Sequence, residues 1–310
     1  MTPLVHKATC AALVAVAIWS VSFVATKHVV TEAAPMASAL VRFLMASTLL
    51  LLVHALLGRS LALPRDCWRL VVWGGLTGTT FTFAFENLAL TYTTAGNSAM
   101  LQAVSPTLAA IGAWLFLRER LGWRQWLGMA LAAAGIAALI GPTAAVTGPG
   151  DMLMGVVMIM GSAYGLISKA LADRLPALTA LTWMLLVGTL GLVPFALSEA
   201  LLGEGFQLPQ SPTAWAGLAY LGLLSSGGAY LLWQWALAHL PVSRVGMFLY
   251  LMPVGTLLVA AAWLGEPLGW SRLGLAALVL FGVYLAVEPT DLATSEDERP
   301  PLKEPLSLTS

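Results

Sequence analysis

The sequence predicts an all-α integral membrane protein whose ten transmembrane helices form two inverted five-helix repeats, with both termini in the cytoplasm. Three observations predict this fold: the composition, the spacing of the apolar runs, and one segment that occurs twice. Of the 310 residues, 59% are hydrophobic and 10% are charged, whereas a soluble domain usually carries about 25% charged residues. The chain therefore needs lipid as its solvent.

Ten apolar runs follow one another, each close to the length of about 20 residues that a helix needs to cross the hydrocarbon core. They lie near residues 9–30, 35–57, 68–90, 95–117, 123–140, 152–171, 177–200, 213–238, 242–264 and 271–288. The first run has the basic start of a signal peptide, but it continues through Trp19 and Phe23 without a small-x-small cleavage site. We therefore expect a retained helix.

The basic residues between the runs predict the orientation. If the N-terminus is cytoplasmic and each run crosses once, external segments carry only Lys27 and Arg272, while Arg42 lies within the second run. Cytoplasmic segments then carry Lys7, Arg59, Arg65, Arg69, Arg118, Arg120, Arg124, Lys169, Arg174 and Arg244. Cytoplasmic loops of membrane proteins hold such an excess of Lys and Arg, so both termini are expected inside.

An internal repeat divides the chain. Residues 89–106 (ALTYTTAGNSAMLQAVSP) align without a gap with residues 236–253 (ALAHLPVSRVGMFLYLMP) at an offset of 147, which also carries the Glu119 loop onto the Glu266 loop. Five crossings separate the copies, so their orientations are opposite. A repeat of this kind is typical of transporters built from two related halves around a central site.

The predicted organisation follows from this repeat. Residues 9–140 form the first five-helix repeat, 141–151 the connecting loop, and 152–288 the second repeat. Residues 289–310 are polar, acidic and proline-containing, so we expect a disordered cytoplasmic tail.

Several classes of protein are disfavoured. Two cysteines without paired spacing, Cys10 and Cys67, indicate neither a disulfide framework nor a metal site, and a net charge of zero argues against nucleic acid as a partner. The fragment Gly148-Pro149-Gly150-Asp151 is similar to a signature of intramembrane aspartyl proteases, but no Asp lies deep in any run. Catalytic and phosphate-binding motifs do not occur. We expect no enzyme and no cofactor.

Several motifs stand out in order along the chain. They are Trp19-Ser20-Val21-Ser22-Phe23-Val24-Ala25, Pro35 with Leu40-Val41-Arg42-Phe43, and the block from Ala89 through Pro106 to Glu119-Arg120-Leu121, which recurs with Pro253 and Glu266. These motifs resemble those of the drug/metabolite transporter superfamily, in its EamA-domain branch. The resemblance covers residues 10 to 288. It implies a ten-helix fold of inverted repeats and export of small metabolites, often amino acids or aromatic and amphipathic compounds. In the second half, Trp183 stands where the first half has Arg42, and Gly161 where it has Trp19, so one half alone could carry a given contact.

Two charges inside apolar runs are the first candidate functional residues. Glu86 lies deep in the third run, where an ionised carboxylate costs about 3 kcal/mol or more. It is a candidate proton-coupling group or a ligand for a substrate cation. It could instead form a structural pair with Arg42 or lie nearer the external interface. Arg42 could hold a substrate carboxylate or extend to the external headgroups.

Uncharged polar and aromatic side chains supply the other candidates for substrate binding. Gln102 and Gln234 each have several hydrogen bonds to satisfy, which favours a wet cavity, and Asn87 is the repeat mate of Gln234. Serines that share a helix face with these amides more often form hydrogen bonds between helices. The candidate aromatic walls are Trp19, Tyr164, Tyr230, Trp233 and Tyr250, with belt positions at the membrane interface as the alternative.

Pro106 and Pro253 occupy equivalent places in the fourth and ninth runs, where each removes a backbone donor and should bend its helix. They are candidate gating elements, with packing geometry as the alternative. Lys169 is expected to anchor at the interface, and Glu119 to bond loop amides or helix ends.

The sequence thus predicts a secondary transporter that exports small organic metabolites by alternating access, with proton antiport as one coupling scheme. Alternatives are a lipid-carrier flippase, or an importer or facilitator of the same fold. The expected location is the inner membrane, and the expected partners are a small-molecule substrate, the bilayer and protons. We expect a monomer or a weak dimer.

Overall fold

The computed structural model describes residues 3–90, 92, 101–102, 104–140, 148–203, 205–264 and 269–287, and every regular element within them is helical. The predicted tail at 289–310, most of the connecting loop and the start of the fourth run lie outside the described residues.

In the first half, the third run consists of three helical segments that follow one another without a gap. The described elements of this half are α1 (Pro3–Val29), α2 (Pro35–Leu56), α3 (Trp68–Gly75), the π-helical η1 (Leu76–Phe81), α4 (Thr82–Leu90), α6 (Ser105–Phe116) and α7 (Trp123–Ile140).

The second half has a similar order, with a π-helical segment again in the middle of its third long helix. Its elements are α8 (Pro149–Ala172), α9 (Ala177–Leu202), α10 (Pro212–Ala219), the π-helical η2 (Tyr220–Ala229), α11 (Tyr230–His239), α12 (Val242–Met247), the 3-10 turn η3 (Phe248–Tyr250), α13 (Leu251–Leu264) and α14 (Trp270–Val287). The predicted runs agree with these bounds to within a few residues, except that α1 begins earlier. α8 begins at Pro149, inside the predicted loop.

Proline and serine account for several helix starts. Pro35, Pro149 and Pro212 stand in the first turns of α2, α8 and α10, where a missing amide hydrogen is harmless. Ser211 also caps α10, because its hydroxyl accepts a hydrogen bond from the Ala214 amide at 3.1 Å.

The outer surface of the bundle is apolar. Leu201, Leu202 and Trp270 are 81%, 88% and 89% exposed, which suits hydrocarbon or the membrane interface rather than water. Among the described residues, six helices are long and apolar enough to cross a membrane. The count of ten crossings and the orientation of the termini stay predictions.

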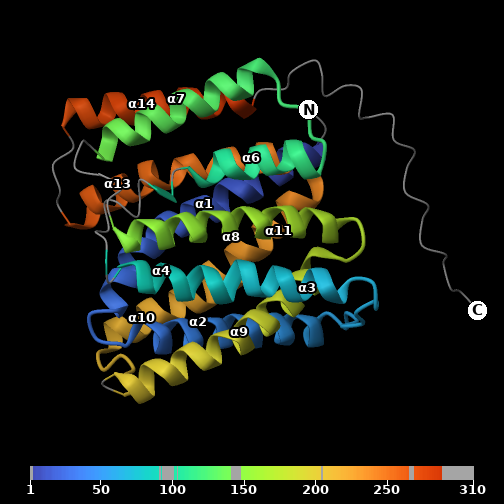
Figure 1. Ribbon diagram of the computed structural model, residues 1–310, viewed down its shortest axis with the longest axis vertical. Coiled ribbons are helices and arrows are strands. Elements are labelled where there is room, and N and C mark those ends of the chain that lie inside the picture. The colour runs from blue at the N-terminus through green and yellow to red at the C-terminus, as the bar shows by residue number, and fades with distance from the viewer. Residues whose placement is uncertain are drawn as a thin grey trace, which may run out of the picture.

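The helices lie side by side in a stack. Figure 1 shows α7 and α14 together at one end of the stack, α2 and α9 at the other, and α1 and α8 between them. The contacts between helices of the two halves have counterparts in which the halves change places. α2 packs on η2 as α9 packs on η1, α1 packs on α11 as α8 packs on α4, and α1 packs on α13 as α8 packs on α6. Two related halves around a twofold axis would pack in this way.

Glycines show the same exchange at the level of atoms. A Cβ on Gly75 would collide with the backbone carbonyl of Met184, and one on Gly222 would crowd Met45 and the backbone carbonyl of Arg42. Gly75 and Gly222 are 147 residues apart, the repeat offset. Met184, rather than Trp183, is therefore the structural counterpart of Arg42, and the sequence alignment of the second helices was one residue out of register.

The ends of the stack show a second exchanged pair. A Cβ on Gly135 of α7 would press on Val279 of α14, and a Cβ on Gly282 of α14 would meet the backbone of Ala132. Gly135 and Ala132 correspond to Gly282 and Val279 at the same offset of 147. Close approach through small residues is how helices associate in lipid.

Candidate functional site

Arg42 lies two turns into α2, and its side chain points into the bundle. Only 8% of the residue is exposed. The guanidinium carbon lies 5.4 Å from the centre of the Phe43 ring and 5.0 Å from that of Phe83, within the range of cation–π attraction. Arg42 therefore does not extend to the headgroups in this conformation, which was one of the two alternatives left by the sequence.

Two serines of η2 hold the Arg42 guanidinium. Its Nε donates to Ser226 Oγ at 2.6 Å, and its Nη2 donates to Ser225 Oγ at 3.1 Å. Both serines are completely buried. The hydroxyls are neutral, so they satisfy donors of Arg42 without cancelling its charge.

Glu86 lies on α4, partly buried, and accepts a hydrogen bond from the side-chain amide of Gln102 at 3.5 Å. Glu86 and Arg42 are close enough to interact electrostatically. No direct ion pair joins them among the contacts of the described residues. The structural Glu86–Arg42 pair considered from the sequence is therefore not formed in this conformation, because each charge has neutral partners instead.

Aromatic rings from three helices gather beside η2. The Trp19 ring lies 5.2 Å from that of Tyr230 and 5.1 Å from that of Trp233, and the Tyr164 and Tyr230 rings are 5.9 Å apart. The Trp19 indole N–H donates to the backbone carbonyl of Ser225 at 3.1 Å. Trp19, Tyr164, Tyr230 and Trp233, hereafter the aromatic cluster, thus connect through Ser225 to the group that holds Arg42.

The predicted amide residues have different surroundings. Gln234 is 1% exposed and lies between α11 and α8, accepting from the Tyr164 hydroxyl at 3.5 Å and donating to the Ser168 carbonyl at 3.5 Å. In this conformation its amide joins the two helices. The side chain of Asn87 lies outside the described part of the chain.

Tyr250 and the two prolines lie where α6 meets the second half. The Tyr250 and Thr107 hydroxyls share a hydrogen bond of 2.5 Å. Pro106 stands in the first turn of α6, directly after a break in the helix, and Pro253 follows the 3-10 turn η3. Regular α-helical geometry is therefore interrupted just before each proline, as expected for residues that remove a backbone donor.

Glu119 ties the end of the first half to the start of α12. Its carboxylate accepts hydrogen bonds from the amides of Val242 and Ser243 at 2.8 and 3.0 Å, and from the Ser243 hydroxyl at 2.6 Å. Arg118, immediately before it, has a φ of 56°, an uncommon conformation for a side chain other than glycine. This strained residue turns the chain so that Glu119 caps a helix of the other half, as the sequence led us to expect.

Lys169 binds the same turn from the other side. Its ammonium group donates to the carbonyls of Leu237 and Leu240 at 2.9 and 3.0 Å. A cation at the end of α11 and an anion at the start of α12 both complement the helix dipoles. Lys169 thus contacts protein backbone, where the sequence predicted an interface anchor.

Sequence reasoning missed Ser225 as a partner of Arg42, and it missed both π-helical segments. A signal was present. The stretch Leu223-Leu224-Ser225-Ser226-Gly227-Gly228 places two hydroxyls and two glycines in the middle of an apolar run. Adjacent polar and small residues at membrane depth mark a point where helices touch or bend.

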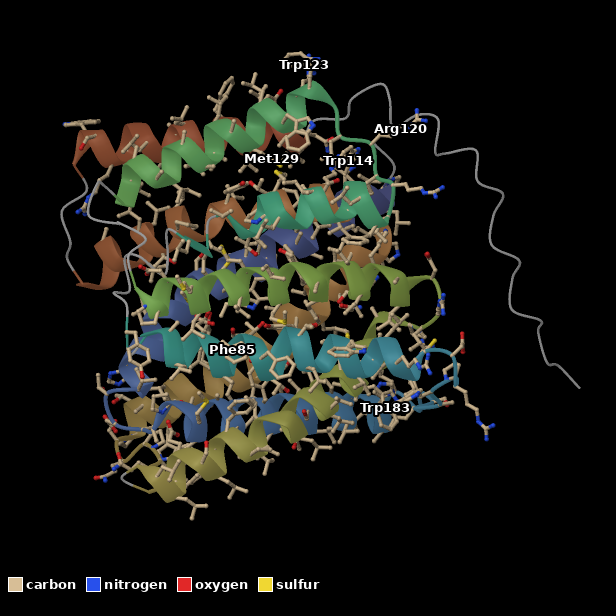
Figure 2. All side chains as sticks on the ribbon, in the orientation of Figure 1. Phe85, Trp114, Arg120, Trp123, Met129 and Trp183 are labelled. Atoms are coloured by element: carbon tan, nitrogen blue, oxygen red, sulfur yellow. The ribbon has the colours of Figure 1, made fainter. Side chains whose placement is uncertain are left out.

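An apolar hollow lies elsewhere, between α8 and the continuous helix made of α3, η1 and α4. Its volume is about 450 Å³, and Trp73, Thr77, Phe81, Phe85, Met160, Ala163 and Ile167 line it. Figure 2 shows Phe85 on the near face of the bundle, away from Trp183 at one corner and Trp123 at another. None of the predicted site residues lines this hollow.

Two stretches of the chain, residues 6–141 and 148–287, match the EamA-like transporter family. They cover both predicted repeats. The resemblance inferred from the sequence motifs is therefore confirmed.

Individual relatives are similar over most of their length. An uncharacterized transporter of Archaeoglobus fulgidus is 31% identical over 277 residues, which cover 86% of this chain and 93% of the relative. A probable terminal-alkyne amino-acid exporter of Streptantibioticus cattleyicolor is 30% identical, covering 88% and 93%. A probable amino-acid metabolite efflux pump of Salmonella typhimurium is 28% identical, covering 89% and 93%.

One crystal structure is also similar. It superposes with a TM-score of 0.78 at 21% identity, covering 91% of this chain and 98% of the other. At that identity the similarity concerns the fold alone.

Proposed function

The chain belongs to the EamA-like transporter family, and we propose that it exports small organic metabolites, amino acids or related aromatic and amphipathic compounds, by alternating access. Its family and apolar helices make it a multi-pass membrane transporter. Relatives named as an amino-acid exporter and an amino-acid metabolite efflux pump support the substrate class. We place it in the inner membrane with both termini in the cytoplasm.

The observation that carries this proposal is the buried charge of Arg42 beside the aromatic cluster. A cation at membrane depth is expensive to keep, and its hydrogen-bond partners here, Ser225 and Ser226, are neutral. A substrate carboxylate would compensate the charge, and the flat faces of Trp19 and Tyr230 would take an apolar or aromatic body. Gln102, Asn87 and Gln234 remain candidates for the polar part of the substrate, and Tyr250 for the opposite wall.

Glu86 is the proposed proton carrier. It has no direct cationic partner among the described residues, and a neutral amide, Gln102, is bonded to its carboxyl group. Burial disfavours the ionised form. In the proposed cycle, Glu86 releases its proton to the cytoplasm when substrate enters and regains one from outside when substrate leaves.

The cytoplasmic end supplies a gate for such a cycle. Glu119 bonds the start of α12, and Thr107 bonds Tyr250, so α6 and the α12–η3 segment are held together. We propose that this contact opens for substrate entry by bending near Pro106 and Pro253. Glu266, which matches Glu119 in the repeat, lies outside the described residues.

The proposal is tested with purified protein in liposomes loaded with L-phenylalanine. An inward proton gradient should accelerate the exit of labelled L-phenylalanine, and Glu86→Gln should abolish this effect of the gradient. Transport that ignores both the gradient and Glu86→Gln would remove proton coupling and leave a facilitator. No transport of any amino acid, aromatic acid or amine would remove the proposed substrate class.

A lipid-carrier flippase is a second candidate, favoured by the apolar hollow between α8 and the helix made of α3, η1 and α4. A lipid substrate would need such a lateral surface. The response to an imposed proton gradient separates export from import: an inward gradient should drive the substrate out of the liposomes if the protein is an antiporter and into them if it is a proton-coupled importer.

A further inference from the structure

The two serines both accept hydrogen bonds from one edge of the planar Arg42 guanidinium, so they leave its other edges without serine partners. Nε and Nη2 lie on the same side of the planar group, and each has one hydroxyl as its acceptor, Ser226 at 2.6 Å and Ser225 at 3.1 Å. A guanidinium has five N–H groups. No partner for the other three occurs among the described residues.

Two of the three unused N–H groups, one on Nη1 and one on Nη2, lie side by side at the end of the guanidinium. This edge matches the two oxygens of a carboxylate and forms paired hydrogen bonds with it. The Phe43 and Phe83 rings pack against the guanidinium, with ring centres 5.4 and 5.0 Å from its central carbon. The group is therefore held in orientation by hydroxyls on one edge and rings beside it.

Both hydroxyls come from consecutive residues of the π-helical segment η2 (Tyr220–Ala229). Ser225 and Ser226 each bond the same group, the Arg42 guanidinium. The carbonyl of Ser225 meanwhile accepts the Trp19 indole N–H at 3.1 Å. One residue thus fixes the charge and the aromatic cluster relative to each other.

We propose that Ser225 and Ser226 are positioning residues that orient Arg42 for paired binding of a substrate carboxylate while the substrate body lies on the aromatic cluster. The inference rests on the proposed function, since it takes Arg42 as the group that binds substrate. The first half lacks this pair of adjacent serines. At the matched offset of 147, Gly78 and Thr79 replace Ser225 and Ser226.

Three probes separate the carboxylate from the rest of the ligand. L-Phenylalanine has both a carboxylate and an amine, 3-phenylpropanoate lacks the amine, and phenethylamine lacks the carboxylate. Their dissociation constants are measured on the full-length protein in detergent. Ser226→Ala should raise the dissociation constants of both carboxylate probes about ten-fold and leave that of phenethylamine unchanged.

Two further variants control for general damage. Ser226→Thr keeps the hydroxyl and copies Thr79, so it should restore binding of both acids. Ser47 is on the same helix as Arg42, and its buried hydroxyl bonds that of Thr189 at 3.2 Å. Ser47→Ala should lower the melting temperature without changing any dissociation constant.

The outcomes distinguish the two levels of the proposal. Suppose that the wild type binds both acids. If Ser226→Ala then binds them with the same affinity, or loses affinity for all three probes alike, the positioning role is wrong and the proposed function stands. If the wild type binds neither acid, the carboxylate site at Arg42 is wrong, and the positioning role fails with it.

Discussion

The two π-helical segments, η1 and η2, have the same backbone geometry and different tasks. Each lies in the middle of the third long helix of its half. A glycine brings this helix close to the second long helix of the other half: Gly75, directly before η1, meets Met184, and Gly222, within η2, meets Arg42. In η1, the Thr80 hydroxyl donates to a backbone carbonyl, that of Gly188, at 2.9 Å. In η2, two hydroxyls bind a charge.

The difference shows how duplicated halves can divide their work. Both copies retain a wide helical turn, which π-helical segments often supply at functional sites. Only one copy faces an arginine. The structural contact at η1 and the proposed binding site at η2 therefore occupy equivalent positions of the repeat, and a few side chains distinguish them.

The largest expected effect comes from removing the charge itself. Arg42→Met makes α2 like α9 at the matched position, and uptake of L-phenylalanine should fall about 30-fold or more, because charged contacts to a ligand are lost. The melting temperature should stay the same or rise, since an isolated buried charge is costly.

Met184→Leu is the matched control, and it should retain transport. Wild-type transport by Arg42→Met would show that the two π-helical segments do not differ in function.

The glycines at the two segments should respond unequally. A Cβ on Gly75 would meet the Met184 backbone, and one on Gly222 would crowd Met45 and the Arg42 carbonyl, so each alanine variant should lower the free energy of unfolding by about 1–3 kcal/mol. Gly75→Ala should be the less stable variant. Gly222→Ala should be the one with slower transport, because it displaces the backbone of Arg42.

Gly228→Ala provides the control within η2. Only the Leu223 carbonyl, at 3.7 Å, lies near a Cβ there, so melting temperature and transport should be nearly unchanged. A loss of transport in Gly75→Ala equal to that in Gly222→Ala would contradict the division of tasks.

A smaller effect is expected for Thr80→Val in η1. The change keeps the shape of the side chain and removes the donor to the Gly188 carbonyl, so the free energy of unfolding should fall by about 1 kcal/mol. Affinity for 3-phenylpropanoate, measured by titration, should not change. A weaker affinity would mean that η1 also serves the binding site.

The smallest effect concerns the loop that leads into α10, the helix before η2. Hydrogen bonds from the hydroxyl of Ser211, and then from its amide, hold the pKa of Glu32 below its usual range. Because the folded protein favours the ionised form, this contribution to stability is complete above the unfolded value of about 4.3. It is lost as the pH falls through the lower, folded value.

Melting temperatures of the wild type and Glu32→Gln should therefore converge as the pH falls from about 6 toward about 3. A difference that does not vary with pH would contradict this. At the corresponding place in the other half, Asp66 before α3 pairs with Arg174 of the loop between α8 and α9 at 3.6 Å, with side chains 68% and 49% exposed. Such exposed pairs contribute little, so Asp66→Asn should change little.

Much of the fold was predictable, because hydropathy alone marks segments that must be helical in lipid. Unsatisfied backbone groups are too costly there for other conformations. The predicted runs at 68–90 and 242–264 agree with the observed helical bounds for this reason. Rarity of charge at membrane depth singled out Glu86 and Arg42 in the same way.

The partners of those charges depend on the tertiary structure. Arg42 and Ser226 are 184 residues apart, and both lie in apolar runs whose hydropathy is the same whichever face points inward. A π-helical segment has the composition of the α-helix around it, so η1 and η2 are recognisable only from their hydrogen bonds. The alignment of Arg42 with Trp183 was wrong by one residue, because the register of packed helices follows glycine contacts and not residue type.

The sequence by itself therefore determined the helices, the repeat and the family, since these depend on hydrophobicity and order along the chain. The tertiary structure alone decided that Arg42 binds two serines, that Glu86 stands apart from it, and that Trp19 lies against Tyr230 and Trp233. Those contacts join segments from both halves, and only the packing of the helices brings them within reach.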